Sequence, residues 1–192
     1  MLDRGVNQII QKEGGDFRFP FIKIADVLGA ADLTFGNLEG PLSDKGEDLG
    51  NIYSFRMFPQ GLDGLKFAGF DILSLANNHI GDWGKEALSD TILNLENAGI
   101  VPIGAGLNQK ETYQSKILEI RGTKIAFLAF SDFLSYLETK DNEVGIAVAN
   151  NDKINLAVRE AKEKADLVIV SFHFGEEYQK WPSLRQENLA KL

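Results

Sequence analysis

Three times along the chain, an amphipathic stretch is followed by an Asp that opens a short apolar run, and then by a polar cluster. The amphipathic stretches are residues 21–31, 61–70 and 151–165, and the Asp residues that follow them are Asp32, Asp71 and Asp166. Short apolar runs rich in Val, Ile, Leu and Phe that lie between helical patterns are typical of buried parallel strands. The pattern therefore predicts an α/β fold made of helix, strand and loop units.

Two further patterns extend the predicted sheet. Residues 116–120 and 124–130 are apolar-rich runs separated by a Gly-containing turn, which predicts an antiparallel hairpin. Residues 85–98 have helical spacing and are followed by Gly99, as is common at helix ends. Residues 101–103 then predict a short strand.

A side chain that can bind a metal stands seven residues after the Asp of each unit. These side chains are Glu39, Asn78 and His173, and His79 follows directly after Asn78. In parallel sheets, ligands bind beyond the carboxyl ends of the strands. We therefore expect these four side chains to meet at one edge of one sheet, where they form part of a metal-dependent hydrolase-type site.

The chain has two histidines, and both follow predicted strands beside a Gly-containing loop. Neutral imidazole is a common metal ligand and also a proton donor near neutral pH. The alternative for His79 and His173 is a hydrogen-bonded structural role. Asn77 and Asn78 precede His79, and an amide oxygen beside an imidazole suits a hard divalent cation with a neighbouring general acid. Two consecutive asparagines are also an ordinary turn signal.

Two acidic residues lie near these positions. Glu39 precedes Gly40-Pro41, where the chain must turn sharply out of the strand, so its carboxylate is presented at the strand end. A carboxylate at this point could bridge two cations, and the alternative is an exposed surface Glu. Asp82 lies just before a predicted helix, and we expect it to cap that helix.

The composition of the 192 residues, 44% hydrophobic and 25% charged, is that of one ordinary globular domain. No stretch approaches the roughly 18 apolar residues that a membrane span needs, and neither end carries a signal-like segment, which predicts a soluble chain. The net charge of -8, without a cluster of Lys and Arg, argues against nucleic acid as a partner. An anionic substrate would need help from bound cations.

Other chemistries have little support in the sequence. It contains no P-loop, no Gly-x-Ser-x-Gly elbow and no Cys nucleophile. Gly104-Ala-Gly106 is too short for a dinucleotide fingerprint. Metal-assisted hydrolysis is the class that remains.

Several motifs resemble those of a known family, the bacterial capsule-synthesis CapA (PGA_cap) proteins of the calcineurin-like metallophosphoesterase superfamily. The motifs are Met1-Leu-Asp-Arg4-Gly-Val6, Asn37-Leu-Glu39-Gly-Pro41, Ser74-Leu-Ala-Asn77-Asn78-His79 with Asp82 and Gly84, and His173-Phe-Gly-Glu-Glu177-Tyr178. They occur in the family's order over nearly the whole chain. The resemblance implies a metallophosphoesterase-like four-layer α/β/β/α sandwich.

The resemblance also implies roles for the candidate residues. Glu39 takes the place of the bridging carboxylate, Asn78 and His173 are further metal ligands, and His79 is the general acid near the leaving group. The candidates for supporting positions around them are Asn77, Asp82 and Arg4. In the intact protein, two divalent cations, with Mn, Zn or Fe as candidates, would activate a water and stabilise developing charge.

The chain departs from the family pattern at both ends. Family members begin with a strand that ends in Gly-Asp, whose Asp is a metal ligand, and this chain starts directly after that position. They also carry a Gly-x-His-x-Pro-His segment beyond the position of Leu192. We therefore expect residues 1–192 to form a single domain that is truncated at both ends and inactive by itself.

Three functional hypotheses stay open for the intact protein. The first is a metal-dependent hydrolase that acts on a phosphoester or on a bond in an anionic cell-envelope polymer. The second is a non-catalytic component of poly-γ-glutamate capsule biosynthesis that binds the polymer or organises membrane-bound capsule synthesis proteins. The third is an α/β binding domain with structural histidines. The resemblance places the protein in the cell envelope, outside the cytoplasm or at the membrane.

Overall fold

The computed structural model describes residues 2–192, so Met1, the first residue of the N-terminal motif, lies outside them. The helices are α1 (Arg4–Lys12), α2 (Ala25–Gly29), α3 (Gly61–Phe67), α4 (Gly84–Asn97), α5 (Gln109–Tyr113), α6 (Asn151–Lys162) and α7 (Leu184–Leu189), with 3-10 turns at Phe19–Phe21 and Ser135–Leu137. The strands are β1 (Phe35–Asn37), β2 (Ile72–Ser74), β3 (Val101–Ile103), β4 (Ala105–Gly106), β5 (Lys116–Ile120), β6 (Thr123–Ser131), β7 (Gly145–Ile146) and β8 (Leu167–His173).

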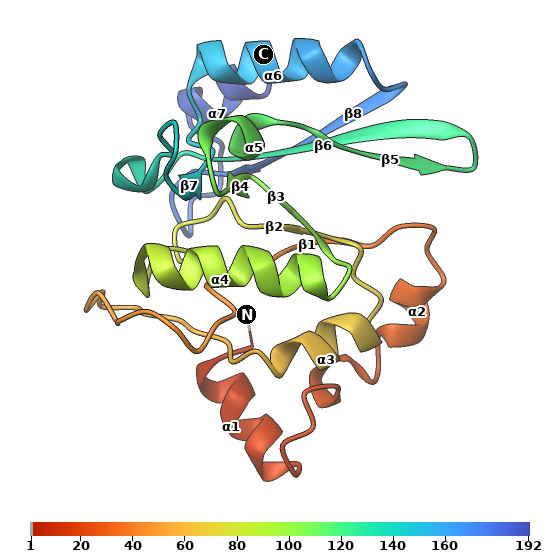
Figure 1. Ribbon diagram of the computed structural model, residues 1–192, viewed down its shortest axis with the longest axis vertical. Helices are drawn as coiled ribbons and strands as arrows, with labels where there is room; N and C mark the ends of the chain where they lie inside the picture. Colours follow the sequence, from red (N-terminus) through yellow and green to blue (C-terminus); the bar gives the residue numbers. More distant parts are fainter. Residues whose placement is uncertain (1) are drawn as a thin grey trace.

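These strands form two sheets of three strands and one short pair. The first sheet has the order β1-β2-β3, and its strands are all parallel. The second has the order β5-β6-β8, in which β5 is antiparallel to β6 and β8 is parallel to it. β4 and β7 form the short antiparallel pair. Figure 1 shows the two larger sheets one above the other near the middle of the molecule.

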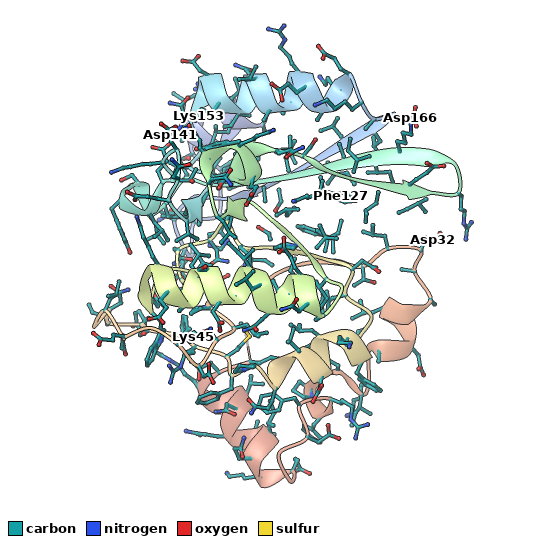
Figure 2. The ribbon with its side chains drawn as sticks, in the orientation of Figure 1. Asp32, Lys45, Phe127, Asp141, Lys153 and Asp166 are labelled. Atoms are coloured by element: carbon teal, nitrogen blue, oxygen red, sulfur yellow. The ribbon has the colours of Figure 1, made fainter. Side chains whose placement is uncertain are left out.

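Side chains of the two larger sheets meet in a shared apolar layer. Ile72 and Ile103 of the first sheet pack with Phe127 and Ala129 of the second, and Phe127 points into the space between the sheets (Figure 2). Gly104 joins β3 to β4 with a φ of +74°, and a Cβ at this position would lie 2.8 Å from the carbonyl oxygen of Ala129. The backbone therefore passes too close to β6 for any side chain.

Helices cover the other faces of these sheets. α6 packs on β6 and β8 through Ile154, Ala157 and Ala161, which recur at helical spacing. α4 contributes Leu88 and Leu95 to the cluster that includes Leu73 of β2. In Figure 1, α6 and α4 lie on opposite sides of the two sheets.

The structure confirms the α/β class and the elements with the clearest patterns. The predicted hairpin is β5 and β6, the predicted helix 85–98 is α4, and the short strand 101–103 is β3. The four-layer sandwich implied by the resemblance stays a prediction.

Two structural expectations are wrong. The three Asp-initiated runs do not share one sheet. β8 pairs over its whole length with β6 of the hairpin and therefore belongs to the second sheet. The stretch 21–31 is not one helix. A 3-10 turn that contains Pro20 ends at Phe21, the first residue of the stretch, and only Ala25–Gly29 is α-helical.

Candidate metal and acid–base site

Three of the predicted side chains converge beyond the carboxyl ends of β1, β2 and β8. Nε2 of His173 lies 2.9 Å from Oδ1 of Asn78 and 3.6 Å from Oε1 of Glu39. The side chains of Glu39 and His173 are 23% and 29% exposed, so they are partly shielded but reachable from solvent. This cluster is called the Glu39 cluster below.

Backbone geometry presents each member of the Glu39 cluster. Glu39 comes two residues after β1, and Gly40 then turns the chain with a φ of +100°, which favours glycine. His173 is the last residue of β8, opposite Ser131 of β6, and its carbonyl accepts from the Asp132 N–H at 3.0 Å. The sharp turn predicted from Gly40-Pro41 is thus present in the structure.

Asn77 ties the segments of the site together. Its side chain is fully buried, and its Nδ2 donates to the carbonyl of Leu38 (2.8 Å) and to Oδ1 of Asn37 (3.2 Å). Its Oδ1 accepts from the backbone N–H of His79 (3.1 Å). Asn37 in turn donates to Oε2 of Glu39 at 2.5 Å. Asn77 therefore holds the loop after β1 against the loop after β2.

His79 forms a pair with Asp82 beside the Glu39 cluster. Nδ1 of His79 lies 2.8 Å from Oδ2 of Asp82, whose side chain is 2% exposed. A carboxylate only accepts hydrogen bonds, so Nδ1 carries the donated proton and Nε2 is left for other chemistry. Phe55 packs edge-on against the imidazole with ring centroids 4.2 Å apart. Partial burial, and then the charge of Asp82, raise the pKa of nearby Tyr136.

The expectation that Asp82 caps the following helix is wrong. α4 begins at Gly84 with Trp83 in the cap position. Asp82 instead turns inward, where its carboxylate accepts from His79, from the Phe55 N–H (2.9 Å) and from Asn51 Nδ2 (2.9 Å). A capping carboxylate needs free N–H groups of the first helical turn, and these donors take their place.

Arg4 reaches the site only indirectly. Its guanidinium carbon lies 4.5 Å from the centroid of the Phe55 ring and 5.4 Å from that of Tyr53, which are cation–π distances. Because Phe55 also contacts His79, Arg4 is linked to the imidazole through the Phe55 ring. Its supporting role around the site stays a prediction.

The Glu39 cluster fits a single divalent cation. Atoms bound to one ion at about 2.0–2.2 Å lie roughly 3–3.5 Å from one another, close to the separations that His173 makes with Asn78 and Glu39. The donors are one carboxylate, one amide oxygen and one imidazole, a mixed set that suits Mn, Zn or Fe. In residues 2–192, no three His, Cys, Asp or Glu side chains gather as a metal-binding group, so the amide is needed as the third donor.

Sequence reasoning missed three residues that shape this site, namely Asn37, Asn51 and Phe55. Asn37 had a usable signal, because it stands two residues before Glu39 near the end of a strand, where alternate residues share a face. Asn51 and Phe55 lie in a loop without periodicity, and their contacts with Asp82 and His79 bridge segments that are distant in sequence.

The fold and this geometry define an α/β domain with a candidate metal and acid–base site at the carboxyl ends of its strands. Residues 1–192 match the model of a family described as bacterial capsule synthesis protein PGA_cap, and the chain belongs to that family. It is thus a member of the CapA-like group of capsule and poly-glutamate biosynthesis proteins.

Individual relatives agree with this assignment. The chain is 33% identical over 200 residues to the capsule biosynthesis protein CapA of Bacillus anthracis, covering 100% of this chain and 48% of that protein. It is 28% identical over 199 residues to the PGA biosynthesis protein CapA of Bacillus subtilis (strain 168), covering 100% and 51%. A probable polyglutamine synthesis accessory protein of Mycobacterium tuberculosis is 32% identical over 108 residues, 55% of this chain and 28% of that protein.

The chain spans about half the length of the two CapA relatives it matches. As for the membrane, the helices within residues 2–192 include none with the length and apolar character of a bilayer span.

Proposed function

We propose that this protein takes part in capsule biosynthesis as a metal-dependent hydrolase of the phosphoesterase type. The observation that carries the proposal is the convergence of Glu39, Asn78 and His173 within ligand distance, beside the His79–Asp82 pair. A divalent cation next to a partly buried, carboxylate-paired imidazole is an arrangement suited to transfer of an anionic group.

Each residue has a defined task in this proposal. Glu39, Asn78 and His173 would hold the cation, which supplies Lewis-acid stabilisation of negative charge on the substrate. Asp82 accepts the Nδ1–H of His79 and so stabilises the protonated ring, whose Nε2–H would be handed to the leaving oxygen. The protein carries a net charge of -8, so the cation would also offset the repulsion of an anionic substrate. The second cation and the four-layer sandwich of the metallophosphoesterases belong to the same proposal.

The relatives favour one second candidate. The name of the mycobacterial relative describes a synthesis accessory protein, and two relatives are named as biosynthesis proteins. A non-catalytic component that binds anionic polymer through a cation, or organises membrane-bound capsule synthesis proteins at the cell envelope, would use the same Glu39 cluster. In that case, His79 would be dispensable for polymer binding.

Turnover of a defined panel of substrates separates the two candidate functions. The intact protein, loaded with Mn²⁺, Zn²⁺ or Fe²⁺, is assayed with p-nitrophenyl phosphate, bis-p-nitrophenyl phosphate and poly-γ-glutamate. The hydrolase proposal predicts metal-dependent turnover of at least one of them and its loss in His79→Ala. Glu86→Gln, a change at an exposed carboxylate of α4, is the control that should keep full turnover. Cation-dependent polymer binding without turnover would support the second candidate and contradict the first.

A further inference from the structure

Asp82 connects His79 to an exposed loop, residues 49–55. This loop contacts Asp82 at three points. The Leu49 N–H donates to its carbonyl oxygen, the Phe55 N–H to Oδ2, and Asn51 Nδ2 to Oδ1, each at 2.9 Å. Two of these donors are backbone groups that any sequence would supply. Asn51 is different because its donor belongs to the side chain.

The geometry points to Asn51 as a positioning residue, which holds the Asp82 carboxylate in the orientation that keeps the proton of His79 on Nδ1. The two carboxylate oxygens have different partners. Oδ2 accepts from both His79 and Phe55, whereas Oδ1 accepts from Asn51. Asp82 is only 1% exposed, so water is a poor substitute for any of these donors.

Loss of the Asn51 amide would leave Oδ1 buried without its donor. Rotation of the carboxylate about the Cβ–Cγ bond would then let Oδ1 compete with Oδ2 for the Phe55 N–H. His79 Nδ1 would lose its aligned acceptor, and the neutral ring would shift toward the Nε2–H tautomer that free histidine prefers in water. In that tautomer Nδ1 no longer donates to Asp82, so the protonated ring that would give its Nε2 proton to the leaving oxygen in the proposed reaction loses its carboxylate partner.

The surroundings of Asn51 favour a specific role over a general packing role. Ile52 and Tyr53, the next two residues, are 91% and 62% exposed, so the tip of the loop has little packing of its own. Asn51 itself is exposed, and only its amide reaches the buried carboxylate. Truncation of this side chain therefore removes one hydrogen bond without opening a core cavity.

The tautomer of His79 can be read directly, because the chain has two histidines and the His173→Gln variant assigns the signals of each. The experiment records ¹⁵N spectra of the two imidazoles at a pH where both rings are neutral, in the metal-free protein. The measurements cover wild type, Asn51→Ala and Asn51→Ser. The serine variant is the milder second change, since its shorter hydroxyl side chain cannot reach Oδ1.

Asn94→Ala is the matched control. Asn94 Nδ2 donates to Oδ2 of Asp90 at 3.0 Å, so its loss removes the same type of Asn-to-Asp hydrogen bond elsewhere in the protein. The inference predicts an Nδ1–H signature for wild type and Asn94→Ala, and a shift toward Nε2–H in both Asn51 variants. An unchanged tautomer in the Asn51 variants would overturn it, as would an equal shift in Asn94→Ala.

The catalytic meaning of this inference rests on the proposed role of His79, but the test uses neither metal nor substrate. If the protein shows no hydrolysis but the Asn51 variants show the tautomer shift, the positioning role of Asn51 is supported and only the proposed function is contradicted. If the protein hydrolyses substrate but the Asn51 variants show no tautomer shift, only the positioning role of Asn51 is contradicted.

Discussion

Nε2 of His173 lies 2.9 Å from Oδ1 of Asn78, although the two residues are 95 positions apart, and Asn78 follows β2 whereas His173 ends β8 in another sheet. The contact exists because β1, β2 and β8 all end on the same side of the molecule, where Glu39 adds its carboxylate 3.6 Å from the same nitrogen. Three segments that are far apart in sequence therefore supply one set of candidate metal ligands. The proposed metal site depends on this convergence.

Loss of the His79 imidazole should slow turnover. His79→Ala should slow turnover of the best substrate by about 10²–10⁴-fold, the usual scale for loss of a general acid, with little change in KM. The measurement is steady-state kinetics of the intact protein with saturating metal. A leaving group that needs no protonation should recover most of the rate in His79→Ala, and failure of this rescue would show that His79 acts in another way.

Stability near neutral pH should depend on Asp90. Burial raises the pKa of Asp90, but the hydrogen bonds from Lys45 and Ser43 outweigh burial and hold its pKa below the ordinary value. Because the folded-state pKa is depressed, this contribution to stability is fully present above the unfolded pKa and is lost as the pH falls through the folded pKa. Asp90→Asn should lower the free energy of unfolding by about 1–2 kcal/mol at pH 7.

The comparison across pH makes this prediction specific. Denaturant unfolding at pH 7 and at pH 3 should show a large gap between wild type and Asp90→Asn at the higher pH and a smaller one at the lower pH. The control is Glu86→Gln on the exposed face of the same helix, which should stay within about 0.5 kcal/mol of wild type at pH 7. A gap for Asp90→Asn that grows as the pH falls would contradict the sign of the shift.

Gly104 should tolerate a side chain far less well than Gly122. Both have positive φ, +74° and +83°, but a Cβ at Gly104 would lie 2.8 Å from the carbonyl oxygen of Ala129, whereas the space around Gly122 is open. Gly104→Ala should therefore lower the free energy of unfolding by about 2–4 kcal/mol. Gly122→Ala carries the backbone strain alone, about 1 kcal/mol. Equal losses in thermal or denaturant unfolding would show that close contact between the sheets is unimportant.

Periodicity predicted those parts of the fold in which local sequence and tertiary packing agree. The helix predicted over 85–98 is present as α4 (Gly84–Asn97), because Leu88 and Leu95 lie on one helical face that the core buries. The hairpin formed because two apolar runs flank a Gly-containing turn. The division into two sheets could not be predicted, because nothing local in the sequence of β8 distinguishes pairing with β6 from pairing with β1.

For the candidate site, the sequence predicted which side chains lie at strand ends better than it predicted their hydrogen-bond partners. The equal spacing of Glu39, Asn78 and His173 from their Asp residues marked three strand ends, and the structure brings these side chains together. Their roles as ligands stay a prediction. Asp82 was misread as a cap, because its partners Asn51 and Phe55 approach from a loop that the local sequence pattern cannot place.

Whether Glu39, Asn78 and His173 bind a cation is tested by titrating the protein and its single-residue variants with a divalent ion. Free Mn²⁺ is measured by electron paramagnetic resonance during titration of residues 1–192, as wild type and as the His173→Ala, Glu39→Gln and His79→Ala variants. The account predicts saturable binding of about one ion per chain in wild type, strong weakening in His173→Ala and Glu39→Gln, and nearly unchanged binding in His79→Ala. Wild-type affinity in His173→Ala, or an equal loss of binding in His79→Ala, would contradict it.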